Sequence, residues 1–267
     1  MDWEEIVTNS TMKGGNVQQT FQEEIQKTIL ACLSRQGAFN DLVFQGGTAL
    51  HFFYGNPRFS EDLDFVTREK QKFDLTQQTT KIQTFVSNVF PFIQETKMTI
   101  QKNDKEMQRL ILSTISEVPA QKLRIHLELA YVPSYINQPK ILDYPPLNPA
   151  VRVEDPSEIL ADKITALGRR TYLKGRDIWD IYFLIVEKHL SIPWDLVFKK
   201  GTDYGSTPEV LKDGLLGASK KIKKEGNSVL SNEMSRFLPP SLLNQYREVF
   251  DKILSRVAKE TEEVEKQ

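Results

Sequence analysis

The chain has 267 residues, of which 39% are apolar, so it can bury a substantial core in one large domain or two modest ones. Its 35 basic side chains nearly balance 36 acidic ones, which excludes a globally basic nucleic-acid binder and confines any such contact to a local patch. The single cysteine, Cys32, excludes an internal disulfide and a multi-cysteine zinc site, and its apolar helical surroundings predict a buried thiol. The first residues lack a secretory pattern and no apolar run reaches about 18 residues, so we expect a soluble cytoplasmic protein with no membrane partner.

Helical and strand patterns alternate between Gln18 and Tyr131. Apolar residues recur at helical spacing in three segments, which predicts helices at 18–34, 48–54 and 71–92. Short apolar or alternating runs predict strands at 42–44, 62–66, 98–102, 107–113 and 122–131. The last strand alternates most cleanly, with leucine and isoleucine on one face and polar side chains on the other.

The pattern changes after Pro133. The stretch up to Pro149 is rich in proline, and we interpret it as the crossing from a mixed α/β part to a helical part. Asp155 and Pro156 then suit a helix start, as an N-cap and a first helical residue. Further helices are predicted near 176–188, 193–200, 208–224 and 240–263. The fold class is therefore α+β, with an α/β domain at 1–147 and a helical domain at 148–267.

Two aspartates separated by one apolar residue are the first candidates for chemistry. If Leu63 and Phe65 point into the core of a strand, Asp62 and Asp64 share the opposite face. Two neighbouring carboxylates repel each other, and a hard dication such as Mg²⁺ relieves that repulsion. The structural alternative is a solvated acidic turn, because the D-x-D pattern is common.

A third carboxylate would complete a two-metal site for in-line phosphoryl or nucleotidyl transfer. Glu128 projects from the polar face of the alternating strand, which suits this role if that strand lies beside the aspartate strand. His126 shares the same face and could coordinate or orient substrate instead. The alternative for both residues, together with Arg124, is a solvated sheet face.

A glycine pair precedes the aspartates, between a predicted strand and a predicted helix. Gly46, Gly47 and Thr48 could place backbone N–H groups and a hydroxyl around a triphosphate at the helix N-terminus. A plain turn is the structural alternative for such a tripeptide. Ser60, two residues before Asp62, could bind a phosphate or cap the turn.

Cations and acids gather again in the helical part. Lys163 lies on one predicted helix, and Lys174 and Arg176 flank the start of the next, where they could neutralise charge on phosphate oxygens. Asp177 and Asp180 are three residues apart on one helix face and could hold these cations or a nucleotide sugar in place. Helix capping by Asp177 and a surface ion pair of Lys163 would give a similar pattern.

Four segments in this order carry a resemblance to a known family: GGTAL (46–50), RFSEDLDF (58–65), DKITA (162–166) and KGRDIWDIYFL (174–184). They resemble the AbiEii/AbiGii toxin family of nucleotidyltransferases, within the DNA polymerase β-like superfamily. The resemblance implies a small mixed sheet with flanking helices, a helical C-terminal half, and an active-site cleft between them.

By the same resemblance, roles pass to residues of the four segments. Gly47 and Thr48 take the phosphate-loop role, with threonine where serine is more usual. Lys163 corresponds to the family's essential lysine, and Asp177 corresponds to the acidic residue near the end of the family's motifs. By the resemblance, Ser60, Asp62 and Asp64 form the metal and phosphate motif, and Lys174, Arg176 and Asp180 have nucleotide-binding roles. The third metal ligand stays a choice between Glu128 and a site completed by His126.

The resemblance also implies the reaction. A nucleoside triphosphate would donate its monophosphate to an acceptor with Mg²⁺ or Mn²⁺ bound, and an RNA or tRNA end is the expected acceptor. A toxin role with a separate antitoxin, often in phage defence, is implied as well. Two alternatives stay open: an antibiotic-modifying nucleotidyltransferase, and a non-catalytic nucleotide-binding or partner-binding module on the same fold.

Overall fold

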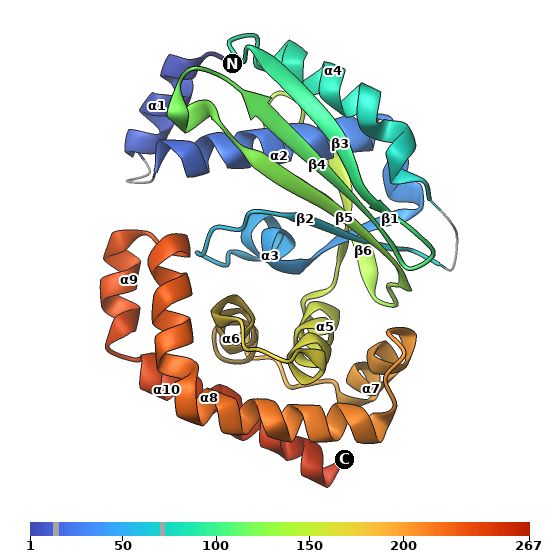
Figure 1. Cartoon of the computed structure of the whole chain (residues 1–267), viewed down its shortest axis with the longest axis vertical. Coiled ribbons are helices and arrows are strands. Elements are labelled where there is room, and N and C mark those ends of the chain that lie inside the picture. Colours follow the sequence, from blue (N-terminus) through green and yellow to red (C-terminus); the bar gives the residue numbers. More distant parts are fainter. Residues whose placement is uncertain (13–15, 70–72) are drawn as a thin grey trace. The chain divides into compact units, whose positions relative to one another are not determined.

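The computed structural model describes residues 1–12, 16–69 and 73–267. The chain divides into two compact units, which we name the sheet unit and the helical unit (Figure 1). The sheet unit comprises residues 1–53 and 59–154, and the helical unit comprises residues 54–58 and 155–267. The short segment 54–58 therefore interrupts the sheet unit in the sequence. It belongs to the same compact unit as the helices that begin about a hundred residues later.

Within the described residues, the sheet unit contains one mixed seven-stranded sheet of order β3-β4-β5-β2-β1-β7-β6. Its strands are β1 (Leu42–Gln45), β2 (Leu63–Thr67), β3 (Glu95–Asn103), β4 (Met107–Ile115), β5 (Arg124–Pro133), β6 (Asn137–Ile141) and β7 (Ala150–Glu154). β2 pairs with β5, and β1 with β7, in parallel, while the other neighbours are antiparallel. All five predicted strands are confirmed, and so is the α+β class.

The strands at the centre of the sheet form because their side chains alternate between two environments. In β2, Leu63 and Phe65 are buried while Asp64 between them is half-buried. In β5, Ile125, Leu127 and Leu129 are fully buried and the intervening polar residues are not. The predicted assignment of polar and apolar faces is therefore confirmed for both strands.

Helices α1 (Trp3–Met12), α2 (Val17–Arg35) and α4 (Thr79–Val89) pack together, and Figure 1 shows α2 and α4 on one face of the sheet. Aromatic rings from these helices and the loop after α4 stack in one cluster, formed by Trp3, Phe21, Phe90 and Phe92. Helix α3 (Gly46–Tyr54) directly follows β1 and begins at the glycine pair, two residues earlier than predicted.

The expected helix at 71–92 is shorter than its apolar pattern indicated. Residues 71 and 72 lie outside the described residues, Leu75–Gln78 form a 3₁₀ turn, and α4 begins only at Thr79. Asp74 caps the 3₁₀ turn by accepting a hydrogen bond from the Thr76 amide at 3.0 Å. The sequence reasoning missed α1 entirely.

The proline-rich stretch that we interpreted as a crossing contains β6, and β7 follows it. Pro139 lies within β6, which is possible because β6 is an edge strand and one of its sides needs no ladder partner. β7 joins the sheet through the parallel pairing of Val153 with Phe44 of β1. Both strands are five residues long, too short for a periodic signal, so the sheet continues further along the chain than the pattern indicated.

The helical unit contains α5 (Pro156–Arg169), α6 (Gly175–Tyr182) with a π-helical turn after it (Phe183–Glu187), α7 (Trp194–Asp203), α8 (Pro208–Phe237), α9 (Pro240–Arg247) and α10 (Phe250–Glu262). α8 extends well beyond the predicted end at residue 224 because its apolar stripe continues through Leu230, Met234 and Phe237, all buried. The helix expected at 240–263 is divided into α9 and α10. None of the helices in the described parts of the chain is both long enough and apolar enough to cross a membrane.

Helix α8 organises the helical unit by packing along α5, α6, α7 and α10 (Figure 1). Glycines allow the closest approaches. A Cβ atom at Gly214 would overlap the carbonyl of Gly168 on α5, and one at Gly175 would lie 2.8 Å from the Val229 carbonyl. These contacts fix α5 and the start of α6 on one helix, and those two elements carry the predicted lysine and aspartates.

Candidate active site

Two carboxylates, Asp64 and Glu128, lie side by side where β2 pairs with β5 in the sheet unit, and a third, Asp62, directly precedes β2; we name these three residues the carboxylate cluster. Asp64 is in register with Glu128 of β5 in the parallel ladder, so their side chains leave the same face of neighbouring strands about 4.8 Å apart. Asp62 directly precedes β2, and its Oδ1 lies 3.0 Å from Nδ1 of His126. The side chains of Asp62 and Glu128 are 30% and 28% exposed, so both can reach a ligand from solvent. The register favours Glu128 as the third acid, next to Asp64, while His126 contacts Asp62.

Arg109 is a member of this cluster that the sequence reasoning missed. It lies opposite Glu128 in the β4–β5 ladder, and its Nε is 2.8 Å from Oε1 of Glu128. The guanidinium therefore offsets the repulsion between Glu128 and Asp64. The sequence carried little signal for Arg109, because the residues that alternate with it on the same face of the strand predicted at 107–113 include Met107 and Ile111.

Gly46 explains why a glycine must stand between β1 and α3. Its φ of +79° is in the left-handed region, and a Cβ atom there would lie 2.6 Å from Oδ2 of Asp64. Glycine satisfies both requirements because it lacks a side chain. The close approach brings the start of α3, whose first N–H groups have no acceptor within the helix, against the carboxylate cluster.

We expect Gly46→Ala to reduce activity more than stability. The left-handed backbone costs an alanine about 1–2 kcal/mol, and the added methyl must also displace the Asp64 carboxylate. Gly205→Ala is the matched control, because Gly205 has a φ of +78° with nothing within 4 Å of its added Cβ. Both variants should lose unfolding free energy in a denaturant titration, Gly46→Ala somewhat more because of that displacement, but only Gly46→Ala should lose activity, by more than about tenfold. Equal activity of the two variants would contradict the role assigned to Gly46.

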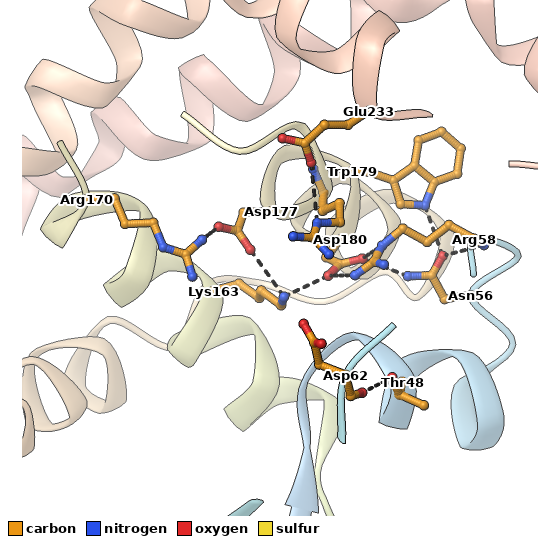
Figure 2. Close-up of polar contacts among 11 residues, drawn as sticks. Thr48, Asn56, Arg58, Asp62, Lys163, Arg170, Asp177, Trp179, Asp180 and Glu233 are labelled. Carbon is orange, nitrogen blue, oxygen red and sulfur yellow. Dashed lines mark hydrogen bonds and ion pairs between the residues drawn. The ribbon is translucent and has the colours of Figure 1, made fainter. Parts of the chain in front are cut away.

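Hydrogen bonds hold the segment that leads into Asp62. The Thr48 hydroxyl, buried in the first turn of α3, donates to the Asp62 carbonyl at 2.5 Å (Figure 2). The carboxamides of Gln22 and Gln26 on α2 donate to the carbonyls of Glu61 and Ser60, each at 3.0 Å. These three hydrogen bonds fix the backbone that carries Asp62. The sequence reasoning named Thr48 only for phosphate binding and missed the two glutamines. The phosphate-binding roles predicted for Gly47, Thr48 and Ser60 stay predictions.

In the helical unit, Asp180 is the centre of a buried ionic network (Figure 2). Its Oδ1 accepts hydrogen bonds from Asn56 Nδ2 at 2.9 Å and from Arg58 Nε at 2.6 Å. Its Oδ2 accepts from Arg58 Nη2 at 2.6 Å and lies 2.8 Å from Lys163 Nζ. Burial opposes ionisation of Asp180, but the charges of Arg58 and Lys163 outweigh it and hold its pKa at about 2. These four contacts occupy the acceptor positions of the carboxylate, while the nucleotide-binding role predicted for Asp180 stays a prediction.

Lys163 connects this network to Asp177, one turn earlier on α6. Its Nζ donates to Asp177 Oδ1 at 3.2 Å while contacting Asp180, so the predicted grouping of these three residues is confirmed. Asp177 also forms an ion pair with Arg170 from the end of α5. The side chain of Lys163 is 16% exposed, so the ammonium lies at the edge of the buried network.

The start of α6 carries two further cations. Arg176 Nε lies 3.4 Å from Glu233 Oε2 of α8, and the same oxygen accepts from the Arg176 amide at 3.0 Å. Burial, together with the charges of Arg170 and Arg176, lowers the pKa of Lys174. The predicted residues Lys174 and Arg176 thus lie with Lys163 in one cationic region of the helical unit.

Asn56, Arg58 and Trp179 are site components that sequence reasoning missed. Asn56 Oδ1 accepts from Trp179 Nε1 at 2.9 Å, and the indole makes an edge contact with the Tyr246 ring, with centroids 4.7 Å apart. Arg58 is 2% exposed although it stands in a polar stretch of sequence. Its position at the head of the RFSEDLDF segment was the only signal available.

Comparison with known proteins identifies a family and two structural neighbours. The sequence profile of the family described as nucleotidyl transferase AbiEii toxin, type IV TA system, matches residues 28–263. A solved structure of a candidate nucleotidyltransferase from Helicobacter pylori aligns with a TM-score of 0.56 at 22% identity, over 93% of this chain and 97% of its own. The JHP933 protein of Helicobacter pylori aligns with a TM-score of 0.55 at 22% identity, over 94% of each chain. No curated protein sequence matches the chain.

Proposed function

This chain belongs to the AbiEii family of nucleotidyl transferase toxins, and from that premise we propose that it transfers a nucleoside monophosphate from a nucleoside triphosphate to an RNA end. The chain is thus a nucleotidyltransferase. Our proposal concerns which molecule donates the nucleotide, which metal ion is bound and which molecule accepts the nucleotide. The observation that carries the proposal is the register of Asp64 with Glu128, beside Asp62 and against the start of α3. This arrangement combines a carboxylate cluster with a helix N-terminus suited to phosphate.

The donor set suits a hard divalent cation, Mg²⁺ or Mn²⁺. Asp62, Asp64 and Glu128 offer carboxylate oxygens, which such ions prefer; Asp64 and Glu128 leave one face of two neighbouring strands, and Asp62 directly precedes the first of them. Arg109 would hold Glu128 in place before the ion binds. When bound, the ion supplies charge neutralisation at phosphate oxygens and orients the reacting groups.

The chain's own residues would bind and orient the substrates. Backbone N–H groups at the start of α3 would bind the triphosphate, with Gly46 and Gly47 allowing close approach. The acceptor hydroxyl oxygen would form a bond to the α-phosphorus and release its proton to solvent, while the bond to the β-phosphate breaks and pyrophosphate leaves. The reaction would depend mainly on positioning and on neutralising charge.

In the helical unit, we assign phosphate neutralisation to Lys163, Lys174 and Arg176. Asp177 would orient the ammonium of Lys163, to which it is hydrogen-bonded. We assign Asp180 to positioning Lys163 and Arg58 rather than to contacting a nucleotide, because its acceptor positions are occupied. Since the family is that of a type IV toxin–antitoxin system, we further propose that a separate antitoxin protein opposes this activity.

The test is a transfer assay with four radiolabelled nucleoside triphosphates and Mg²⁺, supplied with total tRNA, an aminoglycoside, or no acceptor. We expect label on RNA in the presence of Mg²⁺ or Mn²⁺ and none in excess EDTA, because carboxylate-bound cations are required. Label on the aminoglycoside alone would replace the RNA acceptor with a small molecule. Triphosphate binding without transfer to any acceptor would contradict the enzyme assignment and favour a binding module.

A further inference from the structure

The loop between α5 and α6 exposes a tyrosine among cations. Tyr172 is 64% exposed, while its neighbour Leu173 is buried and anchors the loop to the helical unit. Arg169 and Arg170 precede the tyrosine and Lys174 follows it. Arg169 is itself held in place, since its Nη2 donates to the Tyr204 carbonyl at 2.8 Å.

Helix α8 brings further lysines to this loop. Lys221 Nζ donates to the Thr171 carbonyl at 2.5 Å, which fixes the middle of α8 beside Tyr172. Lys224 is exposed and lies about one helical turn after Lys221, on the same side of α8. Lys223 faces elsewhere, because it pairs with Glu262 near the end of α10.

The positive charge of this region exceeds its local neutralisation. The nearby acids Asp177 and Glu233 are already engaged in ion pairs with Arg170 and Arg176. The exposed Glu225, four residues after Lys221, is one further acid set against four cations, Arg169, Lys174, Lys221 and Lys224. Consistent with gathered cations, the pKa of Lys174 is lowered by burial and by those two arginines. An added polyanion would relieve the repulsion among these side chains.

We infer that single-stranded RNA binds a surface formed by Arg169, Tyr172, Lys221 and Lys224, which we name the Tyr172 patch. An exposed aromatic ring among cations is the arrangement that stacks a base and tracks a phosphate backbone. This inference rests on the proposed RNA acceptor and specifies where that acceptor is held. An acidic protein would engage the lysines but would not need the ring, so the ring decides between the two partners.

The experiment measures binding of a fluorescein-labelled, mixed-sequence single-stranded RNA 12-mer by anisotropy, without nucleotide, over a range of salt concentrations. Tyr172→Ala should weaken binding about tenfold to a hundredfold, and Tyr172→Phe should bind as the wild type does, because the ring is kept. Lys221→Glu with Lys224→Glu should lower the slope of log affinity against log salt by about 1.4, the value for two phosphate contacts on a single strand.

Two controls match these changes elsewhere on the surface. Tyr135→Ala removes another exposed tyrosine, and Lys252→Glu with Lys259→Glu reverses two exposed lysines on α10, so neither should weaken binding. Wild-type affinity in Tyr172→Ala, or equal losses in patch and control variants, would overturn the inference. An RNA-binding wild type that transfers no nucleotide would instead refute the proposed function while leaving the patch intact.

Discussion

Asp64→Asn is expected to reduce nucleotide transfer on the order of 10³-fold while leaving the fold intact. The substitution keeps the shape of the side chain but removes the charge that Asp64 adds beside Glu128, and with it much of the affinity for a divalent ion. The initial rate of label transfer at saturating triphosphate and Mg²⁺ measures the loss. Asp62→Asn is expected to behave in the same way, since Asp62 belongs to the same cluster.

The matched control is Asp104→Asn, an equally conservative change in the β3–β4 turn of the same unit. It should transfer at the wild-type rate. Glu128→Gln compared with His126→Gln then decides the third metal ligand: we expect the glutamate variant to lose transfer and the histidine variant to retain most of it. Full activity of Asp64→Asn, with a chelator still inhibiting, would move the metal site away from β2.

Arg58→Met is expected to lower the unfolding free energy by about 3–5 kcal/mol. Arg58 and Asp180 form a bidentate pair with almost no solvent exposure, so removal of the cation leaves a buried carboxylate with only Lys163 and Asn56 as partners. A urea titration followed by circular dichroism measures the change. Transfer should fall as well, because the same network holds Lys163.

Two further variants test whether the loss of stability comes from breaking a buried ion pair or from removing any arginine. Arg176→Met removes an arginine from a partly exposed pair with Glu233 and should cost less than about 1 kcal/mol. Arg58→Met combined with Asp180→Leu should regain much of the lost stability, because no unpaired charge is then buried. If Arg58→Met unfolds at the same urea concentration as Arg176→Met, the network does not support the helical unit.

The prediction of secondary structure succeeded where one face of an element contacts the core and the other does not. β2 and β5 have that property, and their alternation revealed which side chains share a face. It failed for β6 and β7, whose five residues each are too short to show a period and follow several prolines. It also underestimated α8, because Gly226 and several polar residues interrupt a stripe that tertiary packing continues to Phe237.

For the candidate site too, the sequence revealed local features and not long-range contacts. The chemical types of Asp62, Asp64, Lys163 and Asp177 were visible in the sequence, because charged side chains at strand and helix spacing limit where they can point. Their partners were not visible. Arg58 reaches Asp180 across 122 positions of sequence, and no local spacing rule connects residues so far apart.

The order of glycines, acids and lysines along the chain was therefore enough to determine the fold class and the family, since these depend on residue type and local spacing. Only the tertiary structure decided that Glu128 lies beside Asp64, that Thr48 donates to the Asp62 backbone, and that Asp180 is buried between Arg58 and Lys163. Strand register and the burial of ion pairs are non-local properties, set by which segments pack together, and local sequence patterns do not contain them.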